Sequence, residues 1–343
     1  MKQVNIVLMG FGHVGQAFPQ LVQEKKEACR KGFGLDICLY AIFRRGGALH
    51  SPRPLDIREI LECYLSSDLF KNHPHWIKEL KPADVFESFS PGVLVECTPS
   101  NLRSGEPGLS HIRLALDTGW HVVTANKGPL VCDFYSLKEM ARRNGLALKF
   151  SGATAAALPA LDTALYSLAG AEIRRIEGIL NGTTNYILTR MKEGVDYQEA
   201  LQEAQAKGIA ESDPSLDVSG LDTAAKILII TNAVLQTDFS LENIKIEGIE
   251  KIPGYLFEQG KKKDKALKLL GRCIKEGKKY RLEVTLTLLD SSHPLFGVDG
   301  TTKAITFQTD TMNSITVTGG KSDPRSTGAS LLRDIINIYR EDI

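Results

Sequence analysis

The sequence predicts an α/β protein of two domains, in which a doubly wound parallel sheet is followed by an α+β domain. Three observations predict this fold class. At 343 residues the chain exceeds one ordinary domain, since about 150 residues per domain gives roughly two. Short apolar strands in the N-terminal part run into polar or glycine-rich turns and helical segments. Strands in the C-terminal part alternate apolar and polar residues.

The composition is that of a globular protein that works on small molecules. Hydrophobic residues make up 43% and charged residues 24%, so a sizeable core can form. The 42 basic and 41 acidic residues nearly cancel, so we expect neither nucleic acid nor a membrane as partner. The N-terminal apolar run Val4–Met9 is too short for a signal peptide, which predicts a cytoplasmic protein. The six cysteines are scattered without a C-x-x-C pair, which indicates buried thiols.

The first strand, Val4–Met9, ends on a G-x-G-x-x-G motif, and Gln16–Lys31 then reads as an amphipathic helix. This order predicts a Rossmann-type nucleotide-binding domain, because the glycines permit a tight turn and let a pyrophosphate approach the helix N-terminus. The alternative is a tight turn without a ligand. The motif residues expected to bind the cofactor are Gly10, Phe11, Gly12, His13, Val14 and Gly15.

The second strand, Leu35–Phe43, is followed by Arg44 and Arg45, where NAD-binding domains carry an acid. An acid accepts hydrogen bonds from the free ribose hydroxyls, whereas arginine attracts the 2′-phosphate of NADP. The two arginines therefore favour NADP, with NAD as the alternative. They can also be read as two solvated loop residues.

Two further strands, Gly92–Cys97 and Gly119–Thr124, end on polar turns. The carboxyl ends of parallel strands form the edge of an open α/β sheet where ligands bind. We therefore place four residues of these turns beside the cofactor: Thr98, Pro99, Asn126 and Lys127.

In the second domain, Glu283–Leu289, Ala304–Gln308 and Ile315–Thr318 alternate apolar and polar residues, which is typical of a sheet with one face against helices. The last helix, Thr327–Tyr339, is expected to return to the first domain. The predicted boundaries are 1–147, completed by 319–343, for the nucleotide-binding domain and 148–318 for the second domain.

Four motifs in one order carry a resemblance to a known family: T-A-N-K at Thr124–Lys127, I-L-N-G-T-T-N-Y-I-L at Ile179–Leu188, and the segments Glu203–Pro214 and Asp217–Lys226. They resemble homoserine dehydrogenases, in the short form without a C-terminal regulatory domain. The resemblance implies NAD(P)H-dependent reduction of L-aspartate 4-semialdehyde to L-homoserine, in threonine and methionine biosynthesis. It also implies a homodimer, formed by a substrate-binding and dimerisation domain.

The resemblance assigns catalysis to Lys226 and Lys127, with Asp222 orienting Lys226 one helical turn away. Without the motif, Asp222 and Lys226 would be read as a surface ion pair and Lys127 as a solvated loop lysine. The resemblance also implies a substrate pocket in which Glu211 binds the α-ammonium and Asp217 is a second polar contact. Gly182 and Thr183 would offer a backbone N–H and a hydroxyl. Their alternatives are solvated loop acids and a glycine turn.

The chain departs from the family pattern in three places. Ile209 stands where the family usually has an aromatic residue, and the C-terminal glycine-rich segment is altered at Gly319–Pro324. The family's acidic, glycine-rich segment, whose carbonyls hold a monovalent cation, is replaced by Ser151–Pro159. The sequence leaves open whether a metal binds. The candidate is a sodium ion on backbone oxygens of Ser151, Thr154 and Ala156.

Two rival functions remain open at this point. Another Rossmann dehydrogenase of amino acids or semialdehydes is one, but a semialdehyde dehydrogenase of that kind needs a nucleophilic cysteine, and Cys97 and Cys132 have no activating context. The other is a non-catalytic NADP-binding sensor, against which the presence of both Lys127 and Lys226 argues.

Overall fold

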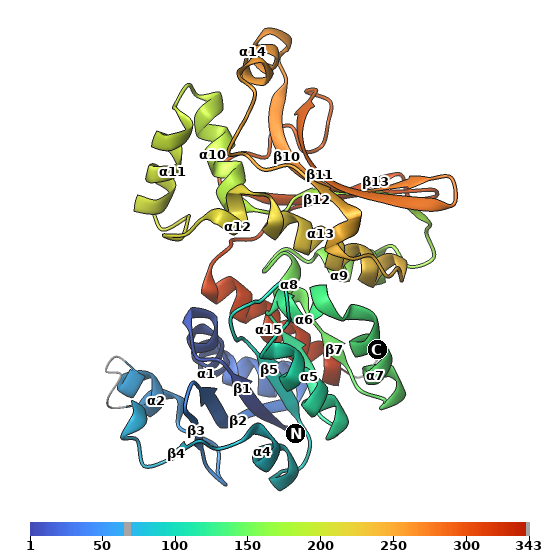
Figure 1. The fold of residues 1–343 in the computed structure, drawn as a ribbon. Helices are drawn as coiled ribbons and strands as arrows, with labels where there is room; N and C mark the ends of the chain where they lie inside the picture. Colours follow the sequence, from blue (N-terminus) through green and yellow to red (C-terminus); the bar gives the residue numbers. More distant parts are fainter. Residues whose placement is uncertain (65–69, 341–343) are drawn as a thin grey trace. The chain divides into compact units, whose positions relative to one another are not determined.

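The computed structural model describes residues 1–64 and 70–340, which form two compact units. The first comprises Met1–Ala153 and Asp323–Ile343, and the second Thr154–Ser322 (Figure 1). The C-terminal helix therefore belongs to the first unit, as predicted. The assignment of nucleotide and substrate binding to the units stays a prediction.

The first unit contains a seven-stranded sheet in the order β4-β3-β2-β1-β5-β6-β7. The strands β2, β1, β5, β6 and β7 run parallel, as the sequence predicted, whereas the short β3 and β4 add an antiparallel extension beyond β2 that the sequence did not reveal. Their bounds are β1 Lys2–Met9, β2 Leu35–Arg44, β3 Gly47–His50, β4 Trp76–Lys78, β5 Val93–Glu96, β6 His121–Thr124 and β7 Leu148–Lys149.

Helices cover both faces of this sheet. Phe18 of α1 and Leu331 of α15 share one core cluster with Val93 and Val95 of β5. Leu94, between those two valines, is also fully buried, and alternate strand residues face opposite sides of a sheet. Both faces are therefore packed. The helices are α1 His13–Phe33, α2 Ile57–Tyr64, α4 Pro82–Ser88, α5 Gly108–Asp117, α6 Lys127–Cys132, α7 Phe134–Arg143, α8 Ser151–Thr154 and α15 Pro324–Tyr339.

The second unit is a mixed sheet in the order β13-β12-β8-β10-β11-β9, with helices packed against one face. Gly271 of β10 permits the close approach of α13, because a Cβ there would lie 3.1 Å from Thr223 and 3.2 Å from Ile227. The strands are β8 Ile173–Ile179, β9 Ile244–Ile246, β10 Ala266–Glu276, β11 Lys279–Leu289, β12 Lys303–Thr309 and β13 Ser314–Gly319. The helices are α9 Ala160–Asp162, η1 Thr163–Ser167, α10 Gly182–Lys192, α11 Tyr197–Ala206, α12 Ser215–Val218, α13 Leu221–Leu235, η2 Leu241–Asn243 and α14 Gly254–Lys263.

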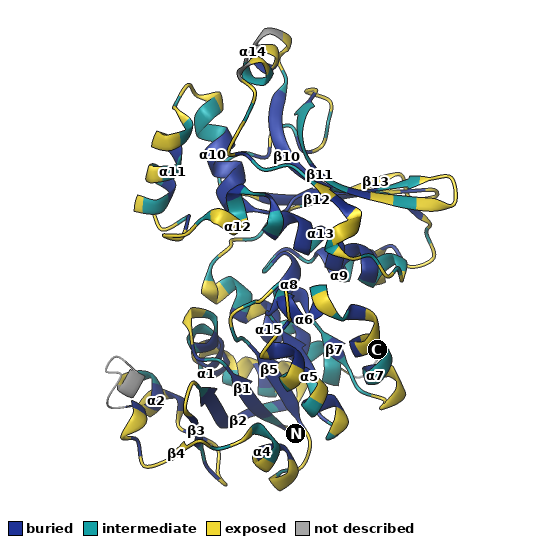
Figure 2. Cartoon of the chain, in the orientation of Figure 1, coloured by how far each residue is buried: buried dark blue, intermediate teal, exposed yellow. Residues whose placement is uncertain are grey.

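Burial follows the strands and the helix faces packed on them (Figure 2). Among the described residues, no helix is long and apolar enough to span a membrane. The prediction of buried cysteines is right for Cys29, Cys38 and Cys273 but wrong for Cys132, which is exposed on the short helix α6, while Cys97 is only partly buried. The side chain of Cys63 lies outside the described residues.

Candidate active site

The glycine motif forms a turn that only glycine fits. Gly10 has a φ of +88°, and a Cβ there would lie 2.7 Å from the backbone of Cys97. A Cβ on Gly15 would lie 2.2 Å from the carbonyl oxygen of Gly10. Gly12 instead faces open space, with nothing within 4 Å of the Cβ position, and it caps α1 without a side-chain hydrogen bond. The first N–H groups of α1 are thus exposed toward a phosphate, so the turn fits a dinucleotide.

Arg44 lies at the same edge of the sheet. Met9 and Phe43 are register partners, and the Gly10 N–H donates to the Phe43 carbonyl at 3.1 Å. The Arg44 guanidinium then stacks 4.8 Å from the ring centroid of Phe70, which is 5.4 Å from that of Phe11 in the glycine turn. Arg45 occupies the exposed hairpin turn. Arg44 is therefore held next to the predicted cofactor turn, and Arg45 follows it in the hairpin.

The carboxyl ends of β5 and β6 are joined by a buried carboxylate that the sequence analysis missed. Glu96 accepts a hydrogen bond from the Thr98 N–H at 2.6 Å and pairs with His111 Nδ1 at 2.8 Å. Asn126 Nδ2 donates to the Thr98 hydroxyl at 3.1 Å. The predicted residues Thr98 and Asn126 are thus brought together. A glutamate within a buried apolar strand was the available signal, since such a group requires partners.

Lys127 begins α6, directly after this cluster. Asn126 caps the helix, because its side chain accepts from the Gly128 N–H, and the Lys127 N–H donates to the Ser100 hydroxyl at 3.0 Å. The lysine side chain is half-buried. The backbone of Lys127 is therefore fixed at the carboxyl end of β6, and its contact with a ligand stays a prediction.

In the second unit, β8 ends at the N-terminus of α10, where Asn181 organises the acids. Its side-chain oxygen caps α10 by accepting from Thr184 N at 2.9 Å. Its amide nitrogen donates to Asp217 at 2.7 Å and to Asp222 at 2.8 Å. Lys226 Nζ lies 2.6 Å from Asp222 and donates to the Leu180 carbonyl at 2.9 Å. The predicted Asp217, Asp222 and Lys226 thus meet through Asn181, which the sequence analysis did not select.

The remaining predicted pocket residues differ in their surroundings. Gly182 approaches the Thr301 carbonyl so closely that a Cβ would lie 2.9 Å from it. Thr183 is buried and its hydroxyl donates to the Ile209 carbonyl at 3.0 Å. Glu211 is exposed in the loop after α11, where its backbone carbonyl accepts from the Gln205 side chain at 3.2 Å. The predicted contacts of these three residues with substrate stay predictions.

The charges of this network are only partly balanced. Burial and the nearby Asp222 carboxylate raise the pKa of Asp217. Asp222 has the Lys226 ammonium beside it at 2.6 Å. The raised pKa of Asp217 indicates that its own negative charge is only partly compensated by the contacts around it.

Comparison with known proteins decides the family. A family profile described as homoserine dehydrogenase matches residues 159–336. The chain belongs to this family. It is 38% identical to the homoserine dehydrogenase of Methanocaldococcus jannaschii over 338 residues, covering 98% of each chain. It is 30% identical to the NAD(+)-dependent homoserine dehydrogenase of Pseudomonas canavaninivorans, covering 99% of this chain and 97% of that one.

A solved structure agrees with the fold. The chain superposes on a hyperthermophilic archaeal homoserine dehydrogenase in complex with NADPH with a TM-score of 0.83 at 26% identity, covering 98% of each chain. These three relatives are matched almost end to end. The protein is thus an NAD(P)-dependent homoserine dehydrogenase, which confirms the resemblance, the two-domain α/β fold and the enzyme class. The role of each site residue stays a prediction.

The unbalanced charge at Asp217 predicts an effect on stability. Because its pKa is raised on folding, ionisation of Asp217 costs stability; the cost is absent below the ordinary pKa of 3.8 and grows as pH rises through the folded value. We expect Asp217→Asn to raise the Tm at pH 8 above that of the wild type, with the difference shrinking as the pH is lowered. Calorimetry from pH 8 downward measures this difference.

Asp213 in the same loop is the matched control. Hydrogen bonds from Ser215 lower its pKa, so Asp213→Asn should lower the Tm at pH 8 or leave it unchanged. A Tm for Asp217→Asn below that of the wild type at pH 8 would show that ionised Asp217 stabilises the fold.

Proposed function

We propose that the chain reduces L-aspartate 4-semialdehyde to L-homoserine with Lys226 as the proton donor. The observation that carries this assignment is the position of its ammonium, held by Asp222 and the Leu180 carbonyl directly before the N-terminus of α10. An ammonium fixed in this way can stabilise an alkoxide that develops beside it and then protonate it. Lys127 is proposed as the second catalytic lysine.

In this reaction the protein has to donate one proton and hold the donor in place. When bound, a reduced nicotinamide would supply the hydride for the aldehyde carbon, and the carbonyl oxygen would then hold the electron pair of the broken π bond. Lys226 gives that oxygen a proton, which forms the alcohol, and the neutral amine is reprotonated from solvent. Asp222 keeps the Nζ in place during the transfer, since the two groups are 2.6 Å apart. The oxygen is thereby protonated where its negative charge arises.

The rest of the pocket fits an amino acid. The N–H groups of Gly182 and Thr183 begin α10 and lie at the positive end of its dipole, which favours the α-carboxylate. The raised pKa of Asp217 indicates that its negative charge is poorly compensated, so an α-ammonium bound beside it would lower that pKa. Glu211, in the exposed loop nearby in sequence, is proposed as a second contact for the ammonium.

The rival reading as a cysteine-dependent semialdehyde dehydrogenase is disfavoured. Desolvation of the thiol by the atoms packed around it raises the pKa of Cys97 well above its ordinary value, and partial desolvation together with the Asp133 carboxylate raises the pKa of Cys132. Both thiols are therefore kept protonated, and the thiolate is the nucleophile. The remaining rival, a sensor that binds NADP without catalysis, would bind NADPH without oxidising it when the semialdehyde is added.

We propose NADP as the preferred cofactor, with NAD as the alternative. The relatives include an NAD(+)-dependent enzyme and one in complex with NADPH. Here the end of β2 carries Arg44, stacked on Phe70 beside the glycine turn, and Arg45. A guanidinium at this place suits a 2′-phosphate and offers nothing equivalent to a free ribose hydroxyl pair.

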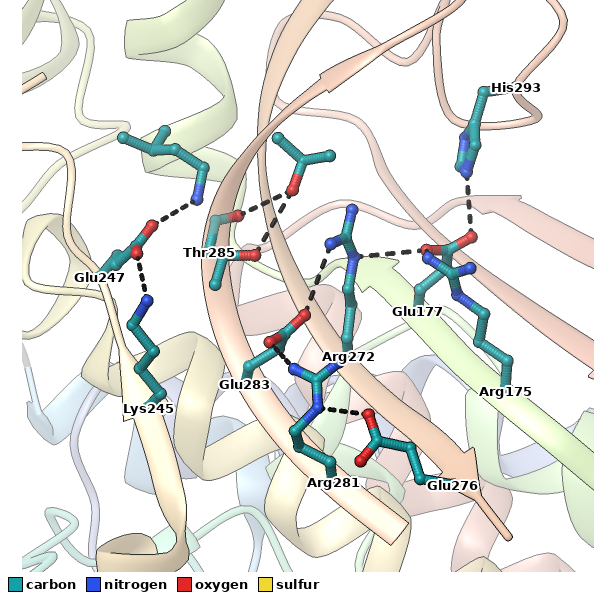
Figure 3. Close-up of polar contacts among 12 residues, drawn as sticks. Arg175, Glu177, Lys245, Glu247, Arg272, Glu276, Arg281, Glu283, Thr285 and His293 are labelled. Atoms are coloured by element: carbon teal, nitrogen blue, oxygen red, sulfur yellow. Dashed lines mark hydrogen bonds and ion pairs between the residues drawn. The ribbon is translucent and has the colours of Figure 1, made fainter. Parts of the chain in front are cut away.

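We further propose a cytoplasmic homodimer that pairs through the open face of the second sheet. Gly271 faces α13, so its neighbour Arg272 faces away from the helices. Arg272 lies between Glu177 and Glu283 in one cross-strand row, 3.5 Å from each (Figure 3). Glu177 also binds Arg175 at 2.8 Å and His293 at 3.0 Å. Because these charges are paired within one chain, a second sheet laid over them would leave none of them as an uncompensated buried charge.

The role of Lys226 predicts a selective loss of turnover. We expect Lys226→Ala to lower kcat by at least about a hundredfold while NADPH affinity stays nearly unchanged, because only the proton donor is lost. Oxidation of NADPH with aspartate semialdehyde measures the first and fluorescence titration the second.

Lys207→Ala is the matched control, since Lys207 also lies 2.6 Å from an acid one turn away, but on the surface. It should keep its kcat. A Lys226→Ala enzyme that retains most of its kcat would remove Lys226 from the mechanism.

The arginines predict a cofactor preference. A charge-assisted contact with the 2′-phosphate is worth about 1.5–3 kcal/mol, so NADPH should bind roughly ten- to a hundredfold more tightly than NADH. Replacing Arg44 and Arg45 together with alanine should remove most of this preference and leave NADH affinity little changed. Equal affinities of the wild type for the two cofactors would contradict the proposal.

The dimer surface predicts a mutation that separates the chains. Thr285 lies on the open face, two residues along β11 from Glu283, and is partly exposed (Figure 3). Thr285→Arg adds an unpaired charge and bulk there, and we expect the mass by light scattering to fall from two chains to one. Gln198→Arg, on the exposed side of α11, should remain dimeric. Thr285→Arg that stays a dimer would place the interface elsewhere.

A further inference from the structure

A lysine of β12 is almost completely withdrawn from solvent. Lys303 is 1% exposed, and its Nζ donates to the backbone carbonyl of Ala155 at 2.6 Å. Ala155 is itself fully buried. An ammonium is costly to bury, so one placed here must be held by the groups around it.

The acceptor lies in the segment where the family resemblance places a monovalent cation. Ala155 stands between Thr154 and Ala156, whose backbone oxygens are candidate ligands together with that of Ser151. Its carbonyl oxygen accepts from Lys303 and also from the Leu158 N–H at 3.2 Å, which uses both lone pairs. A sodium ion on this segment would also lie close to the buried ammonium and be repelled by it. The segment therefore already has a positive charge beside it, and a second cation there is disfavoured.

Lys303 connects this segment to β12, the strand that pairs with β8. Ala304, next to Lys303, is the register partner of Ile179, the last residue of β8 before Leu180, Asn181 and Gly182. The Thr301 carbonyl, just before β12, lies so close to Gly182 that a Cβ there would be 2.9 Å from its oxygen. The charge of Lys303 is thus placed where it can fix the Ala155 segment against the strand that supports the Lys226 site.

We propose that the ammonium of Lys303 replaces the monovalent metal ion as the cation of this segment, so that the enzyme needs neither sodium nor potassium. Lys303 is a positioning residue. The inference rests on the family membership and on the Lys303 contact, and it does not depend on the proton-donor role of Lys226.

The test compares salts of equal ionic strength. Tetramethylammonium cannot replace a small cation on backbone oxygens, because its charge is covered by methyl groups. The wild-type kcat should agree within twofold between tetramethylammonium, sodium and potassium chloride. The wild-type Tm should be the same in the three salts within experimental error. Saturable activation of the wild type by sodium or potassium would overturn the proposal without any variant.

Two substitutions at position 303 separate charge from packing. Lys303→Asn opens space and supplies an amide oxygen, which is a suitable ligand for a hard cation. In tetramethylammonium chloride its kcat should fall at least tenfold and its Tm should fall measurably. Both should recover saturably as sodium or potassium is added, because a ligand that binds the folded state stabilises it. Lys303→Met keeps the length but supplies neither charge nor ligand, and no salt should rescue it.

The variants also distinguish a structural lysine from a substitute cation. A Lys303→Asn enzyme whose kcat and Tm are the same in all three salts would overturn the proposal. If Lys303→Asn is unfolded in tetramethylammonium, circular dichroism should show it folding as sodium is added. Failure to fold in every salt would count against the proposal, because the vacated site would then not accept a cation.

Discussion

The second unit depends on one amide that holds two acids. Asn181 donates to both Asp217 and Asp222 through a single nitrogen, while its oxygen caps α10. Two carboxylates this close repel each other, and the raised pKa of Asp217 records that repulsion and its burial. The end of β8, the start of α10, the short helix α12 and the helix α13 therefore converge on one side chain. An apolar residue at 181 would remove one donor from each of the two carboxylates, and the loss of a donor to a buried charged group costs more than an ordinary hydrogen bond contributes.

The first unit has a similar arrangement around a single acid. Glu96 is fully buried at the end of β5, and the Thr98 N–H and His111 bind its two oxygens. Asn126 then connects this carboxylate to the start of α6. In both units an asparagine that follows a strand caps the next helix and binds an acid from another element. The start of that helix and the acid are thereby held together by one side chain.

The sequence predicted those parts of the fold whose signals are local. The strand, glycine turn and helix from Val4 to Lys31 are contiguous, so their pattern could be interpreted directly, and Lys226 was found through an unbroken motif. The strand β10 was missed because Lys268 and Gly271 interrupt its apolar run. Asn181 was missed because its partners lie 36 and 41 residues away, and nothing local marks Lys303 as buried. Such contacts follow from strand order, which short-range patterns do not contain.

Three lysines of the second unit make similar hydrogen bonds but differ in how far their ammonium groups are exposed. Lys226, Lys268 and Lys303 each donate to a backbone carbonyl, at Leu180, Val298 and Ala155 respectively. Lys268 and Lys303 are each 1% exposed, whereas the side chain of Lys226 keeps 14% of its surface open. An ammonium that is enclosed can only hold its neighbours in place, because no substrate reaches it. Lys226 combines a fixed position with an open side, and a proton donor needs both properties.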